Sequence, residues 1–199
     1  MTPEPKLTEL GEVKPNDTSL KSTFYEQLVE HTFISELLQE AWFGHNEVVE
    51  VMRSEIDAYG YDLVLECRGV LRHVQLKTSK NPDSQQNVAT VLGDKPAGCI
   101  VLVVRVDPKN DIDANRTKLS YRFFGKYYDR ENPEKDLKLN LTDFKPTKRT
   151  RATKVVDEEG DKYVKKFRRA TLVVPKSLFK PDDKKTVKMS VLLNWLFGI

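Results

Sequence analysis

Apolar and polar residues alternate in the middle of the first half of the chain, the pattern that is typical of β-strands. Two such runs, Tyr61–Glu66 and Val70–Leu76, are separated by a segment with Arg68-Gly69 at its centre, where a turn is expected. A hairpin that turns at this pair places residues opposite each other when their numbers sum to 137, so Asp62 faces Gln75. Strand alternation then puts Lys77 on the same face as Gln75. The other face of the hairpin is apolar, with Leu63, Leu65, Val74 and Leu76.

A longer apolar period, of about 3.6 residues, predicts a helix from Ser22 to Trp42. Glu36 and Glu40 are expected on its solvated side, whereas Glu30 falls within the apolar arc. A carboxylate that faces the core needs a partner, because leaving it unpaired costs several kcal/mol. The residues expected in the arc are Phe24, Leu28, His31, Ile34, Leu37, Leu38, Ala41 and Trp42.

The remaining apolar runs complete a mixed α and β pattern. Residues 1–18 contain three prolines and no apolar period, so we expect a flexible tail before a single domain at 19–199. Two further helices are expected, at Ser84–Leu92 and Met189–Phe197. The expected strands are Glu47–Arg53, Cys99–Val106, Leu119–Phe124, Leu137–Leu141 and Tyr163–Pro175.

The composition is that of a polar globular protein, with 39% hydrophobic and 32% charged residues. No apolar run approaches the roughly 18 residues that span a membrane, and the N-terminus has no basic start followed by an apolar block. Cys67 and Cys99 both lie in apolar strand-like runs, which indicates buried thiols in a reducing compartment. We therefore expect a cytoplasmic protein with no membrane partner.

Charge is distributed unevenly, although the net charge is only +3. Residues 1–66 hold 14 acidic and 4 basic side chains, a balance of −10, and residues 145–188 hold 15 basic and 6 acidic ones, a balance of +9. A basic stretch of this kind favours contact with phosphates, although it is also compatible with a solvated loop or an acidic protein partner. The basic side chains best suited to phosphate contact are Lys148, Arg149, Arg151 and Lys154, followed by Arg168 and Arg169.

One pair of motifs resembles a known family. Gly60-Tyr61-Asp62-Leu63, followed by Gln75-Leu76-Lys77 thirteen positions after the Asp, resembles the PD-(D/E)xK nuclease superfamily in the form in which Gln replaces the second acidic residue. The resemblance covers about half of the chain. It implies an α/β fold of the restriction-endonuclease-like type, with an αβββαβ core at 19–107 and a mixed central sheet flanked by helices. Residues 108–199 would form a β-rich extension.

The resemblance also implies a site and an activity. Asp62, Gln75, the carbonyl of Leu76 and Glu30 would hold Mg²⁺ or Mn²⁺, both of which accept oxygen ligands. Lys77 would stabilise the attacking hydroxide or the phosphate. The expected reaction is metal-dependent endonucleolytic hydrolysis of DNA, most simply double-stranded, in restriction, repair or defence. Restriction-like enzymes are often dimers, so the question whether this chain forms a homodimer is left open.

Several alternatives to this interpretation also stay open. Gln75 removes one negative charge from the site, so the chain is either an active nuclease or a non-catalytic nucleic-acid-binding module on the same fold. Glu30 has a structural alternative, an ion pair with a core-edge Arg or Lys. Asp62 and Lys77 have one too, an exposed salt bridge worth about 0–1 kcal/mol.

Overall fold

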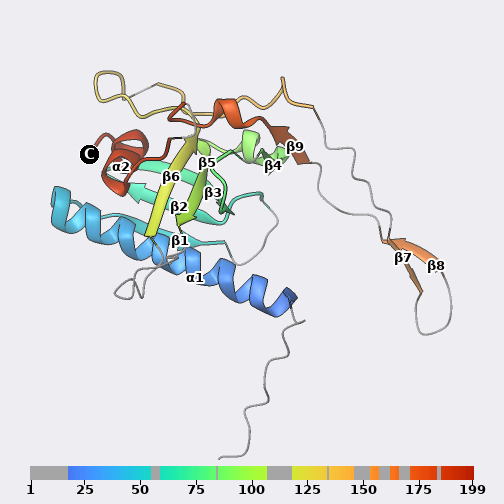
Figure 1. Ribbon diagram of the computed structural model, residues 1–199. Helices are drawn as coiled ribbons and strands as arrows, with labels where there is room; N and C mark the ends of the chain where they lie inside the picture. The colour runs from blue at the N-terminus through green and yellow to red at the C-terminus, as the bar shows by residue number, and fades with distance from the viewer. Residues whose placement is uncertain are drawn as a thin grey trace, which may run out of the picture.

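A five-stranded mixed sheet carries both helices of the described chain on one face (Figure 1). This computed structural model describes residues 18–54, 59–83, 85–106, 118–133, 135–145, 153–156, 162–165, 171–182 and 185–199. The strand order in the main sheet is β1-β2-β3-β5-β6. Strands β3 and β5 are parallel, and every other neighbouring pair is antiparallel. The expected mixed α/β class is therefore confirmed.

Helical and extended segments alternate along the first half of the chain. The helical elements are α1 (Thr18–Gln39), the π-helical turn η1 (Glu40–Gly44), the 3₁₀ turns η2 (Thr90–Asp94) and η3 (Lys176–Leu178), and α2 (Met189–Phe197). The strands are β1 (Glu50–Arg53), β2 (Leu63–Cys67), β3 (Val70–Ser79), β4 (Gln86–Ala89), β5 (Gly98–Val106), β6 (Lys118–Phe124), β7 (Thr153–Val156), β8 (Lys162–Lys165) and β9 (Thr171–Val174).

The β2–β3 hairpin has the register expected from its turn. Arg68 and Gly69 have φ values of +55° and +78°, the left-handed pair that a two-residue hairpin turn of type I′ requires. Cys67 pairs with Val70 across the turn, and every further pair in the ladder also sums to 137. The ladder stops at Leu63, so the expected Asp62–Gln75 pair is not part of it. Asp62 lies just outside β2 and is held differently, as described below.

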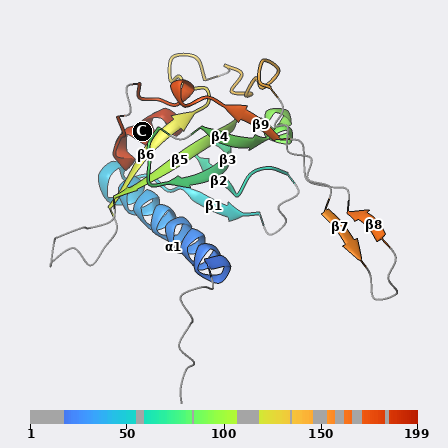
Figure 2. The same ribbon diagram turned by 45° about the vertical axis from the view of Figure 1, so that its right-hand side comes forward.

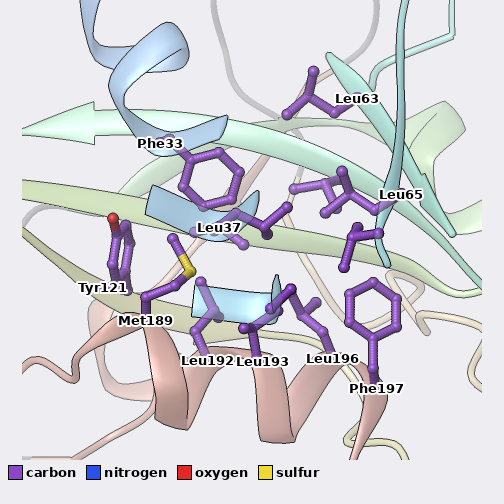
Figure 3. Packing of buried hydrophobic residues seen from close by; sticks show 14 of the residues in the cluster. Phe33, Leu37, Leu63, Leu65, Tyr121, Met189, Leu192, Leu193, Leu196 and Phe197 are labelled. Atoms are coloured by element: carbon purple, nitrogen blue, oxygen red, sulfur yellow. The ribbon is translucent and has the colours of Figure 1, made fainter. Parts of the chain in front are cut away.

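The first core cluster lies between the sheet and the two helices. Phe33 and Leu37 from α1 and Leu192, Leu193 and Leu196 from α2 meet residues of β2 and β6, as Figure 3 shows. All these side chains are buried. Burying a leucine or phenylalanine side chain stabilises the fold by about 1.5–3 kcal/mol, so this cluster holds the helices to the sheet. The helix at Met189–Phe197 and the strands near 98–106 and 118–124 are confirmed.

The opposite sheet face is covered by strands and irregular chain, which corrects the prediction of helices on both sides. Its buried residues include Ile100, Leu102 and Val104 of β5 and Val88 of β4. The predicted helix Ser84–Leu92 is wrong, because residues 86–89 pair with β9 as a two-stranded sheet and a 3₁₀ turn follows. The β-branched Val88 is suited to that pairing, and its partner strand lies some 80 residues away, which a local pattern does not reveal.

Helix α1 is apolar on two sides, whereas the sequence suggested one broad arc. The buried stripe is Val29, Phe33, Leu37 and Ala41, the last of them in η1. Glu36, expected in solvent, accepts a hydrogen bond from the hydroxyl of Tyr121. The prediction was wrong for five residues of the arc, which are exposed: Phe24, Leu28, His31, Leu38 and Trp42.

Other boundaries differ from the prediction as well. Residues 137–141 form no strand, although Leu139 and Leu141 are buried in the second cluster. The run Tyr163–Pro175 is divided between β8 and β9. The expected tail lies outside the described residues except for Thr18, which begins α1. Among the helices described, none has the length and apolar character needed to cross a membrane.

A buried arginine joins α2 to the sheet. Arg72 on β3 is fully buried, and its guanidinium donates to the carbonyls of Leu196 (2.8 Å), Lys126 (3.0 Å) and Trp195 (3.2 Å). Two of these carbonyls lie in the last turn of α2, where a helix presents unpaired acceptors and partial negative charge. The sequence contained a signal for this role, since Arg72 shares the alternation phase of Val74.

Candidate metal and phosphate site

Asp62 lies at the point where strand β2 begins, and hydrogen bonds with backbone groups of Val74, Ser54 and Leu76 hold it there. Its N–H donates to the carbonyl of Val74 (2.9 Å), and its carbonyl accepts from the N–H of Ser54 (2.9 Å). Its Oδ2 accepts from the N–H of Leu76 at 2.6 Å. The carboxylate therefore takes the place that a backbone carbonyl would fill if the β2–β3 ladder continued.

The backbone of Leu76 is consistent with the predicted ligand role of its carbonyl. The N–H and C=O of a strand residue are directed toward the same neighbouring strand. Since the Leu76 N–H bonds Asp62, the Leu76 carbonyl also faces the side on which Asp62 lies. Two oxygen-bearing groups from β3 and from the start of β2 thus share one edge beyond the end of the ladder.

Gln75 contributes the most unusual atom of the site. The residue is only 7% exposed, and its Oε1 is buried with no hydrogen-bond partner among the described residues. A buried amide oxygen without a partner costs about 1–3 kcal/mol. Such groups are rare in folded proteins, and an ion or ordered water that bonds the atom is a common explanation.

Lys77 is placed on the same sheet face as Gln75. In the parallel ladder with β5, Gln75 pairs with Ile100 and Lys77 pairs with Leu102. Ile100 and Leu102 both belong to the second core cluster, so Gln75 and Lys77 are directed toward that face. Lys77 is partly exposed, as an amine that acts on a bound ligand would need to be.

Glu30 is not brought to this face. Its carboxylate forms an ion pair with Arg53 at 2.9 Å, and Arg53 pairs with Leu63 across β1 and β2. Leu63 belongs to the first core cluster, on the face covered by α1. The structural alternative considered for Glu30, an ion pair with a core-edge arginine, is therefore what the structure contains. Its role as a metal ligand stays a prediction.

An aromatic and cationic group adjoins the site, and most of it was not expected from the sequence. The rings of Tyr59 and Tyr61 stack with centroids 6.2 Å apart, and His73 meets Tyr61 edge-on at 4.9 Å. Lys95 lies over both tyrosines, with its Nζ 4.3 Å from the Tyr59 centroid and 5.5 Å from that of Tyr61. Tyr59 is 51% exposed. Strand alternation places His73 on the same face as Gln75, but Lys95 lies twenty positions beyond Gln75, where no local pattern relates it to the hairpin.

His73 is held in a position that disfavours its charged form. Burial lowers the pKa of His73 below its ordinary value, and the nearby Lys95 ammonium lowers it as well. A hydrogen bond to the carbonyl of Pro96, 2.7 Å from Nδ1, raises the pKa, but its effect is smaller than that of burial. At neutral pH the imidazole is therefore neutral, and Lys95 supplies the positive charge beside the tyrosines.

The predicted phosphate contacts lie outside what the structure describes. Lys148, Arg149, Arg151, Arg168 and Arg169 are not among the described residues. Lys154 is in β7, but its side chain is not described. Within the described ranges, Lys77 of β3 shares the face of Gln75, and Lys95, which follows η2, lies over Tyr59 and Tyr61.

The donor set suits a hard divalent cation. Carboxylate, amide and carbonyl oxygens are the ligands that Mg²⁺ and Mn²⁺ accept, and the unpartnered Gln75 oxygen is suited to a cation. Within the described residues, no three His, Cys, Asp or Glu side chains are grouped to hold a metal ion. A site at Asp62 therefore depends on neutral oxygens for its other protein ligands, and its affinity would be modest.

Comparison of the chain with protein-family models, with curated proteins and with solved structures finds no match.

Proposed function

We propose that the protein is a divalent-metal-dependent nuclease that hydrolyses phosphodiester bonds of DNA, on a restriction-endonuclease-like core, at the end of the β2–β3 ladder. The observation that carries the proposal is the buried and unpartnered oxygen of Gln75, together with the Asp62 carboxylate, which accepts a hydrogen bond from the N–H of the next residue, Leu76, at 2.6 Å. The mixed sheet with its parallel β3–β5 pair supports the same interpretation.

Asp62, Gln75 and the carbonyl of Leu76 would hold the cation. When bound, a Mg²⁺ or Mn²⁺ ion would lower the pKa of a coordinated water and neutralise charge on the phosphate. Asp62 supplies the anionic ligand, and its bond to the Leu76 N–H fixes the orientation of the carboxylate. Gln75 supplies a neutral oxygen and adds no further negative charge.

Lys77 and Lys95 would bind the phosphates. The Lys77 ammonium is a compact charge with three donors on the same face as Gln75, suited to hold a non-bridging phosphate oxygen as charge develops on it. Lys95 and the half-exposed Tyr59 would contact the neighbouring nucleotide. The Lys95 amine would bind its phosphate, and the Tyr59 ring would stack on its base. The neutral His73 fixes the Tyr61 ring beside them.

A second candidate function is a nucleic-acid-binding module without catalysis. The observation that favours it is the ion pair between Glu30 and Arg53, which leaves Asp62 as the carboxylate at the candidate site among the described residues. Such a module would bind DNA with strong salt dependence and would need no metal.

Metal binding tests the proposal first. We expect calorimetric titration with Mn²⁺ to detect weak binding in the wild-type protein and at least tenfold weaker binding in Asp62→Asn. The asparagine can still accept the Leu76 N–H bond, so the fold should be retained. Asp136→Asn is the matched control, since Asp136 is an exposed carboxylate that pairs with Lys126. Equal Mn²⁺ binding in the wild type and Asp62→Asn would rule out the site.

Cleavage distinguishes the two functions. We expect Mn²⁺-dependent cleavage of plasmid and linear duplex DNA that is abolished by Asp62→Asn and reduced at least 100-fold by Lys77→Ala, a loss of about 2.7 kcal/mol of transition-state stabilisation. Products that persist in both variants would come from a contaminant and would contradict the proposal. Salt-sensitive DNA binding without products in any divalent metal would instead support the binding module.

A further inference from the structure

Helix α1, continued by the turn η1, carries a second apolar stripe that the core does not use. Its members are all exposed: Phe24, Leu28, His31, Ser35, Leu38 and Trp42. The four apolar side chains are 67%, 47%, 40% and 54% exposed in chain order. The first turns of the helix extend beyond the sheet in both views (Figures 1 and 2). Large apolar residues that gather on one solvent-facing stripe indicate a contact surface.

The spacing of the stripe is that of a helix–helix seam. Successive members are 4, 3, 4, 3 and 4 residues apart, the alternation of steps that the a and d positions of a coiled coil follow. The buried stripe differs, since Val29, Phe33, Leu37 and Ala41 are spaced by 4 throughout. The exposed set is therefore a second and independent pattern, suited to another helix rather than to the sheet of the same molecule.

The seam is also symmetric about its own centre. Phe24 and Trp42, Leu28 and Leu38, and His31 and Ser35 are three pairs whose numbers each sum to 66. In an antiparallel helix pair, facing residues have a constant sum. Two copies of α1 related by a two-fold axis would therefore match aromatic with aromatic, leucine with leucine and polar with polar. This self-complementarity is the property that an isologous interface requires.

We propose that α1 is the dimerisation element of this protein and that its partner is α1 of a second copy in antiparallel orientation. Aromatic residues lie at both ends of this interface, leucines lie between them, and the polar residues His31 and Ser35 lie at the two-fold axis. The proposal concerns assembly only and does not depend on nuclease activity.

Charge is compatible with this pairing. The helix is acidic, with Glu26, Glu30, Glu36 and Glu40, but none of these lies in the seam or in the positions that flank it. The flanking residues are all uncharged: Tyr25, Gln27, Thr32, Ile34, Gln39 and Ala41. Two acidic helices can therefore meet without like charges in contact.

The size of the interface sets the expected affinity. A covered aromatic side chain buries about 150–250 Å² in total, so the exposed parts of the four aromatic residues in two copies amount to on the order of 400 Å². The leucines and flanking residues would raise the total to about 1,000 Å², close to the lower limit of specific interfaces. We therefore expect a micromolar rather than a nanomolar dimer.

Sedimentation equilibrium on the full chain, from about 1 to about 300 µM, tests the assembly. We expect a monomer–dimer equilibrium in the wild type and a dissociation constant at least 30-fold larger in the Leu28→Glu/Leu38→Glu variant. Leu178→Glu is the matched control, because Leu178 is also 40% exposed but lies in η3. A wild-type monomer throughout this range, or equal weakening by the control, would overturn the proposal.

A charge-swap variant tests the orientation. In the antiparallel register, Leu28→Glu/Leu38→Lys brings the introduced carboxylate of one copy against the introduced ammonium of the other, so dimerisation should exceed that of Leu28→Glu/Leu38→Glu at least tenfold. A parallel pair would place like charges together at both positions and show no such recovery. Both positions are exposed and ten residues apart, so neither variant should change the fold, which circular dichroism checks. Equal dissociation of the two variants would refute the antiparallel arrangement.

Discussion

Replacing Gln75 by methionine tests whether its buried oxygen has a partner. Methionine has a similar length and volume but no strong polar atom, so Gln75→Met mainly removes the amide. A buried acceptor without a partner costs about 1–3 kcal/mol. We therefore expect the free energy of unfolding in metal-free buffer to be unchanged or up to about 2 kcal/mol higher. For a chain of this size, 2 kcal/mol corresponds to about 4–8 °C in Tm.

Gln75→Glu should behave in the opposite way. A carboxylate at a 7% exposed position is poorly solvated, so burial would raise its pKa and destabilise the fold at neutral pH. The folded state would then bind the proton more tightly than the unfolded state, and stability would fall as pH rises above about 4.3. Mn²⁺ should reverse this loss, because the new charge would add an anionic ligand to the proposed cation site.

The assay is urea denaturation followed by circular dichroism, in EDTA and in millimolar Mn²⁺. Gln75→Met should not respond to Mn²⁺, whereas Gln75→Glu should gain stability with it. If Gln75→Met loses more than about 1 kcal/mol in EDTA, the amide has a stabilising partner and the reasoning is wrong. If Mn²⁺ does not stabilise Gln75→Glu, the position is not beside a cation site.

Three further predictions concern the surrounding structure. Arg72→Met should lower the free energy of unfolding by about 3–5 kcal/mol in urea denaturation, since three carbonyls lose their donor and each such loss costs about 1–3 kcal/mol; a loss under about 1 kcal/mol would contradict that role. Burial lowers the pKa of His73, so the unfolded state takes up a proton at a higher pH than the folded state does. The free energy of unfolding should therefore fall as pH drops below about 6.5, and His73→Gln should lack this fall. Identical pH profiles of stability in the two proteins would contradict this role of His73. Burial raises the pKa of Cys99 to about 11, so alkylation of the native protein near neutral pH should be far slower than after unfolding, as mass spectrometry can measure; rapid native labelling would show that the thiol is exposed.

Local patterns decided those parts of the fold that depend on neighbours in the chain. The Arg68-Gly69 turn and the alternation on either side were sufficient to give the hairpin register. The continuous apolar run of β5 indicated a strand buried on both faces, and its residues lie in both core clusters. The same register brought Asp62 to the end of the ladder, although its carboxylate bonds the N–H of Leu76 and no ladder pair with Gln75 forms.

Long-range contacts decided the rest, because they depend on which distant surface a segment meets. Gln86–Ala89 became a strand through β9, and Glu30 paired with Arg53. Periodicity gave α1 one broad apolar arc, and it did not reveal that five residues of this arc are exposed while Val29 and Phe33 meet the sheet. The sequence thus determined which side chains share a strand face, whereas only the tertiary structure decided which of them are buried, because burial requires a partner surface from elsewhere in the chain.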